Sequence, residues 1–115
     1  MTYLIYIAIG LFMLAAVLGL IILIEILSDR ATPKLVAFIH GLIAGVALLL
    51  VVIYIATHKG TGPLLSMVIL MLAAVSGYTL FAINARKRPI GKWLILLHPL
   101  LAIVGLITLV AYALF

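Results

Sequence analysis

Cysteine is absent from this 115-residue chain, and charged residues are scarce. Without cysteine the chain has no disulfide, no thiolate metal site and no covalent haem attachment through a Cys-x-x-Cys-His motif. Only Glu25 and Asp29 are acidic, which leaves a formal net charge of +5. Hydrophobic residues make up 70% of the chain, and the mean hydropathy is +1.58. No soluble domain of this size can bury so much apolar surface, so we expect a membrane protein without a soluble domain. We therefore expect no nucleotide or nucleic-acid chemistry.

Four long apolar runs make up most of the chain. Each is about 20 residues long or slightly longer, the length that crosses a bilayer as a helix. The four runs cover residues 3–27, 35–57, 64–85 and 93–115. The breaks between them carry charge, glycine or proline, at residues 28–34, 58–63 and 86–92. The sequence therefore predicts an all-α membrane protein, a four-helix transmembrane bundle with up-down-up-down topology. The first run lacks a basic leader, so we expect it to be retained in the mature protein.

The positions of lysine and arginine predict the orientation. The basic residues of two breaks lie on one side, namely Arg30, Lys34, Arg86, Lys87, Arg88 and Lys92. Only Lys59 lies on the other side. The positive-inside rule then places loops 28–34 and 86–92 in the cytoplasm and both termini outside, in a membrane that we take to be the bacterial cytoplasmic (inner) membrane. The same basic set is also suited to anionic lipid head groups or to an acidic group of a ligand.

An internal repeat organises the chain. Residues 1–57 align with residues 59–115 without a gap, at a constant offset of 58. The identical pairs include polar and small residues as well as aliphatic ones: Met13–Val17 with Met71–Val75, Gly19 with Gly77, Arg30 with Arg88, Lys34 with Lys92, His40 with His98, and Tyr54 with Tyr112. Chance similarity among aliphatic residues explains the matched Arg, Lys, His, Gly and Tyr poorly. We predict one domain of two tandem helical hairpins, related by a pseudo-two-fold axis along the membrane normal.

His40 and His98 are the strongest candidate site residues. Each follows its lysine (Lys34 or Lys92) by six residues, which places it about 9 Å below the basic interface. In an up-down-up-down bundle the second and fourth helices are diagonal, so two imidazoles at one depth can reach one iron atom from opposite sides. A pair without a carboxylate or thiolate is poor for zinc or copper alone. We therefore expect one haem b with both histidines as ligands; a proton relay, another metal, or two structural histidines are the alternatives.

Small residues near the histidines predict room for a flat ring. They lie at helical spacings from each histidine: Ala44 and Ala47 in the first half, Ala102 and Gly105 in the second. Gly19 and Gly77 are expected either to pack helices closely or to leave room for the edge of a planar cofactor. At the basic interface Arg30, Arg88, Lys34 and Lys92 are candidates for binding the haem propionates.

A ligating imidazole also needs a partner for its second nitrogen. The candidates are Ser76, Thr79 or a free backbone carbonyl, such as the one that Pro99 releases at Ile95. The sequence does not choose among them.

In helix count, paired histidines, glycines and basic rim, the chain resembles the four-helix b-type membrane cytochromes, such as the superoxide-oxidising, ascorbate-reducible and hydrogenase-linked kinds. That resemblance implies electron transfer through haem b to or from a quinone or a partner protein. Many members hold two haems with four histidines. Here only His58 remains, outside the repeat, so the resemblance extends to a single haem.

Other functions remain open at this stage. Glu25, expected to pair with a nearby basic residue, is also a candidate proton or cation site of a small-solute transporter. The small multidrug resistance transporters are similar in size and helix number, but their glutamate lies at mid-helix, where this chain has Leu14. A third reading is an assembly subunit without a cofactor, and a second copy of the chain is a further candidate partner. Tyr54 and Tyr112 are interpreted as members of an interfacial aromatic belt.

Overall fold

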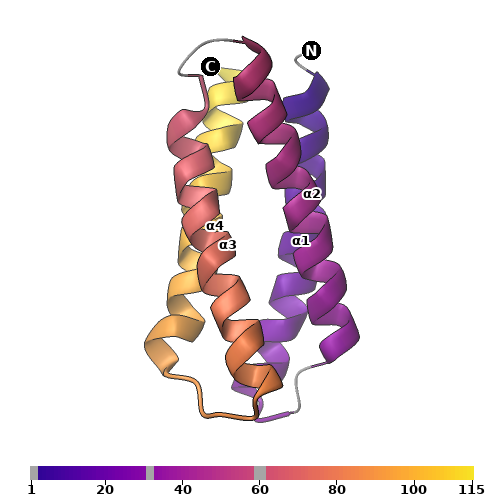
Figure 1. Cartoon of the computed structure of the whole chain (residues 1–115), viewed down its shortest axis with the longest axis vertical. Helices are drawn as coiled ribbons and strands as arrows, with labels where there is room; N and C mark the ends of the chain where they lie inside the picture. The colour runs from indigo at the N-terminus through magenta and orange to yellow at the C-terminus, as the bar shows by residue number, and fades with distance from the viewer. Residues whose placement is uncertain (1–2, 31–32, 59–61) are drawn as a thin grey trace.

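Four α-helices make up almost all of the computed structural model, which describes residues 3–30, 33–58 and 62–115 (Figure 1). They are α1 Tyr3–Leu27, α2 Lys34–His58, α3 Leu64–Ala85 and α4 Lys92–Leu114. Each is long and apolar enough to cross a membrane. The predicted fold class is confirmed, and every predicted span agrees with its helix to within one residue at each end.

The helices form an elongated bundle with extents of 43 × 21 × 21 Å. Both chain ends lie at the same end of the bundle, as Figure 1 shows. The closest packing is within the hairpins, between α1 and α2 and between α3 and α4, whereas α2 with α3 and α1 with α4 touch less. Within the described ranges the backbones of α2 and α4 do not approach each other closely, nor do those of α1 and α3. The two histidine-bearing helices are therefore diagonal, as predicted.

The turns that follow α1 and α3 have the same backbone conformation. Asp29 and Lys87, which are 58 residues apart, both adopt the left-handed region, with φ of 57° and 53°. The amide of the next residue then bonds back across the helix end, from Arg30 to the carbonyl of Glu25 at 2.9 Å and from Arg88 to that of Ile83 at 3.2 Å. This is the Schellman pattern, which usually employs glycine. The repeat thus extends to backbone conformation and places Arg30 and Arg88 equivalently.

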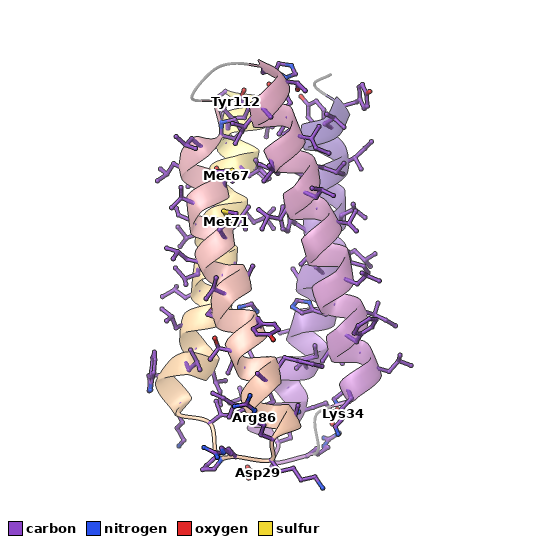
Figure 2. All side chains as sticks on the ribbon, viewed as in Figure 1. Asp29, Lys34, Met67, Met71, Arg86 and Tyr112 are labelled. Carbon is purple, nitrogen blue, oxygen red and sulfur yellow. The ribbon has the colours of Figure 1, made fainter. Side chains whose placement is uncertain are left out.

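The buried core lies in the half of the bundle that contains the chain ends. Its members come from all four helices: Ile5, Ala8, Phe12, Ala47, Val51, Tyr54, Leu70 and Leu109. Many other large apolar side chains are exposed, including Leu35, Val75 and Trp93, as expected for surfaces that face lipid rather than water. Asp29, Lys34 and Arg86 lie together at the opposite end from Tyr112 (Figure 2). The predicted basic side is therefore one end of the bundle; Lys59 is outside the described residues.

Candidate functional site

A cavity of about 750 Å³ separates the two hairpins in the half of the bundle nearer the basic end. Nearly all of its lining residues fall into pairs 58 apart, among them Ala15 with Ala73, Gly19 with Gly77, and Ala44 with Ala102. The lining is mostly aliphatic and small, because both hairpins bring their alanines and glycines to the same face. The two halves of the repeat therefore build one symmetric chamber.

His40 from α2 and His98 from α4 meet across this chamber. Their ring centroids are 6.1 Å apart and their planes are perpendicular, at 90°. Both rings are half-buried and line the cavity. The diagonal helices thus bring the predicted pair close together, with one imidazole contributed by each hairpin.

Each imidazole is anchored by its Nδ1 to its own hairpin. The Nδ1 of His40 lies 2.7 Å from the carbonyl oxygen of Ala15, and that of His98 lies 2.8 Å from the carbonyl oxygen of Ala73. A carbonyl oxygen only accepts, so both Nδ1 atoms carry the proton and donate it. Each Nε2 is then left with a lone pair, and no hydrogen bond to either Nε2 is found among the described residues. Nε2 is therefore the atom through which each ring can interact with a further group.

Gly19 and Gly77 make this anchoring possible. A Cβ on Gly19 would lie 3.0 Å from Cε1 of His40, and one on Gly77 would lie 2.7 Å from Cε1 of His98. Each glycine follows its anchoring alanine by four residues, so it leaves that alanine's carbonyl open to an approaching ring. The glycines therefore leave room for the imidazoles themselves, which is neither of the two roles expected from the sequence.

The sequence predicted that a backbone carbonyl could accept from the second imidazole nitrogen, but it did not predict that these carbonyls belong to Ala15 and Ala73. Ile95, whose carbonyl Pro99 was expected to release, lines the cavity but does not anchor either ring, and Thr79 donates to the carbonyl of its own helix at Val75, 2.8 Å away. Ser76 does reach His98, with Oγ 3.2 Å from Nδ1. The anchoring alanines are equivalent in the repeat, since each lies 25 residues before its histidine.

The predicted strip of small residues is correct for its first half only. Ala44 and Ala102 line the cavity beside the histidines. Ala47 is fully buried in the core, and Gly105 lies against Leu70, where an added Cβ would meet the leucine at 2.7 Å. Of the four predicted positions, only the nearer pair therefore faces the open space, which extends along the same helices to Leu48 and Leu106.

At the basic end a second cavity of about 570 Å³ continues the first, sharing Ile26, Asn84, Ile90 and Ile95 with it. Its lining also includes Arg30, Arg88 and Lys92, three of the four predicted cations. Lys34 is not among its lining residues, although it lies at the same end of the bundle (Figure 2). The histidine chamber thus opens toward a positively charged mouth.

Glu25 is paired with Arg30, one of the cations of this mouth. Its Oε1 lies 3.3 Å from an Nη of Arg30, which confirms the expected pairing with a nearby basic residue. The two side chains are 26% and 64% exposed, so the pair contributes at most about 1 kcal/mol to stability. Within the described residues Glu25 lines neither cavity.

The tyrosines of the repeat are more than interfacial residues. Tyr54 is only 7% exposed, and its hydroxyl lies 2.9 Å from that of Tyr112, so the pair joins α2 to α4 at the end opposite the basic mouth. His58 stacks on the ring of Tyr54 at a centroid distance of 4.0 Å. The belt interpretation of Tyr54 is therefore wrong: its ring is buried, and its hydroxyl is satisfied within the bundle.

The described residues contain no group of three or more His, Asp, Glu or Cys side chains that could hold a metal ion, so any metal in the chamber would rely on the two histidines and on its own further ligands. Comparison with protein-family models, with curated proteins and with solved structures finds no match to this chain.

Proposed function

We propose that the protein binds one haem b between His40 and His98 and works as a membrane electron-transfer protein. The observation that carries the proposal is the pair of imidazoles, 6.1 Å apart and each held by Nδ1, inside an apolar chamber with a basic mouth.

The separation of the rings supports a single metal between them. A metal–imidazole bond of about 2.0 Å on each side, with about 1 Å more from each nitrogen to its ring centre, places the two ring centres roughly 6 Å apart. The observed centroid distance of 6.1 Å meets this requirement, and the proposal further requires both Nε2 atoms to turn toward the metal. Two imidazoles supply only two ligands, which suits an iron whose other four come from a porphyrin.

The surroundings of the rings also favour a porphyrin over a bare ion. Around the histidines, Ala44, Ala102 and their neighbours leave a cavity of about 750 Å³, within the usual range for a cofactor site. Arg30, Arg88 and Lys92 at the mouth supply the cations that carboxylates require. The donor set and the space therefore both agree with haem b.

When held by His40 and His98, haem b would supply a one-electron redox couple, and two histidine ligands would favour electron transfer over oxygen chemistry. The chain's own contribution is to fix each imidazole through Nδ1, to keep water from its apolar walls, and to neutralise carboxylates at the mouth. A quinone or a redox partner protein would exchange electrons from the basic side, because the core of the opposite half leaves no comparable space.

The test is the absorption and EPR spectrum of the full chain, purified in detergent after expression with ample haem. We expect a low-spin b-type spectrum with split bands on reduction. The ferric EPR signal should be that of a low-spin iron with two imidazole ligands. His40→Ala and His98→Ala should each abolish this spectrum. His58→Ala is the matched control, since His58 stacks on Tyr54 away from the chamber. A colourless wild-type protein that takes up no haem would refute the proposal.

The transporter alternative relies on Glu25, whose position does not favour it. The carboxylate is paired with Arg30 and is absent from the lining of the chamber. Resistance to toxic cations that depends on the full chain and is lost in Glu25→Gln would favour transport instead.

A further inference from the structure

The anchoring of the two imidazoles is symmetric except for one hydrogen-bonding side chain. Ser76 on α3 is buried at 8% exposure, and its equivalent 58 residues earlier is Leu18 on α1. Ser76 Oγ lies 2.8 Å from the carbonyl oxygen of Ala73 and 3.2 Å from Nδ1 of His98. Since leucine offers no such group, His40 has one acceptor at Nδ1 whereas His98 has two.

The proton positions in this cluster are fixed by elimination. Ser76 has one hydroxyl proton, and the carbonyl of Ala73 can only accept it. Toward His98 the hydroxyl oxygen is therefore left as an acceptor, so the imidazole must be the donor. Ser76 and Ala73 together hold the proton of His98 on Nδ1 and leave its Nε2 unprotonated.

We propose that Ser76 is a positioning residue that makes the two histidines inequivalent, by giving His98 a second Nδ1 acceptor that His40 lacks. This inference rests on the proposed haem site. An additional acceptor at Nδ1 makes Nε2 a stronger donor to a metal and fixes the orientation of the ring. His98 is then the stronger ligand of the pair.

The repeat supplies a matched set of variants. Ser76→Ala removes the second acceptor at Nδ1 of His98. Leu18→Ser places a hydroxyl at the equivalent position beside His40. The double variant, which combines these two changes, moves the second acceptor from one hairpin to the other. Because Ser76 also bonds to Ala73, the alanine variant leaves that carbonyl to His98 alone and offsets part of the loss. We therefore expect Ser76→Ala to weaken haem binding by about 10-fold, the lower end of the usual range for such partners.

The midpoint potential distinguishes positioning from a structural role. Ser76→Ala should raise the potential of the bound haem, because a weaker donor stabilises ferric iron less. Leu18→Ser should lower it, and the double variant should return close to the wild-type value. If Ser76→Ala leaves both haem affinity and midpoint potential unchanged, or if the double variant keeps the potential of Ser76→Ala instead of returning toward the wild-type value, the proposal is wrong.

The haem-free protein provides a separate readout. In ¹⁵N-resolved NMR spectra of the full chain in micelles, the Nδ1 protons of His40 and His98 should resonate apart. They should converge in Ser76→Ala and exchange their order in the double variant. Coincident resonances in the wild-type chain would overturn the role of Ser76 even if haem binds. A chain that takes up no haem but gives the expected NMR pattern would refute the haem site and leave the asymmetry standing.

Discussion

The two halves of the bundle are built from the same repeat but are packed in opposite ways. In the half that contains the chain ends, Ile5, Val51 and Leu109 have no exposed surface, and the hydroxyls of Tyr54 and Tyr112 meet at 2.9 Å. In the half nearer the basic end the same four helices surround a cavity of about 750 Å³. The two hairpins are in contact in the packed half, and the cavity separates them in the open half.

This difference matters because lipid does not press apolar helices together. Within a bilayer, helices associate through van der Waals packing and hydrogen bonds between them. The packed half has both, and it joins the hairpins directly. At the open half each histidine bonds only within its own hairpin, so a ligand that joins Nε2 of His40 to Nε2 of His98 would supply the missing connection. Ligand binding should then stabilise the fold by mass action.

The largest expected effect is on the packed half. Leu109→Ala removes a fully buried side chain and should lower the free energy of unfolding by about 2–5 kcal/mol. The visible spectrum of bound haem should stay unchanged, because Leu109 does not line the chamber. The measurement is reversible unfolding of the haem-free chain in mixed micelles.

Ile107→Ala is the control for this variant, since the side chain of Ile107 on the same helix is 62% exposed. It should change stability by less than Leu109→Ala. Equal losses for the two variants would show that the assigned core does not hold the hairpins together.

The next effect concerns the open half. Gly77→Ala would place a methyl group 2.7 Å from Cε1 of His98, too close for the ring to keep its place. The displaced ring should lose its bond to Ala73, and haem affinity should fall by about 100-fold. Gly19→Ala should cost less, because its Cβ would lie 3.0 Å from the His40 ring. Affinity is measured by titrating haem into the purified haem-free chain.

Gly10→Ala tests whether any glycine substitution has this result. Its added Cβ would meet no atom within 4 Å, so haem affinity should remain at the wild-type value. If Gly10→Ala and Gly77→Ala weaken binding alike, the close approach of imidazole to glycine is not what the site requires.

The sequence predicted the open half better than the packed one. Hydrophobic length fixed the helix spans, and the offset of 58 identified His40, His98 and the basic residues of the mouth. Each of these signals is a residue type that is costly or rare in an apolar helix, so its position carries information. The anchoring carbonyls of Ala15 and Ala73 could not be identified, because every residue has a carbonyl and only packing decides which one is within reach.

The residues of the packed half could not be identified from the sequence because of their composition. Leu109, Val51 and Ile5 are ordinary aliphatic residues in a chain where most residues are aliphatic, and in lipid a buried face and a lipid-facing face have similar composition. The same ambiguity affected Tyr54, since tyrosine near a helix end is usual at a membrane interface. Its partner at an offset of 58 was the available sign that it points inward.

The smallest effect tests the bond between the tyrosines. Tyr54→Phe keeps the ring that stacks on His58 and removes only the hydroxyl, whose bond to Tyr112 should contribute about 0.6 kcal/mol, and up to about 1.7 kcal/mol, as membrane hydrogen bonds do. The two single variants should differ. Tyr54 is 7% exposed and Tyr112 is 38% exposed. Tyr112→Phe leaves the more deeply buried hydroxyl, that of Tyr54, without a partner, so it should lower the free energy of unfolding by more than Tyr54→Phe does. The double variant strands neither, so its loss should be smaller than the sum of the two single losses. Additive losses in this cycle would mean that the hydroxyls do not interact, and that apolar packing alone closes this end of the bundle.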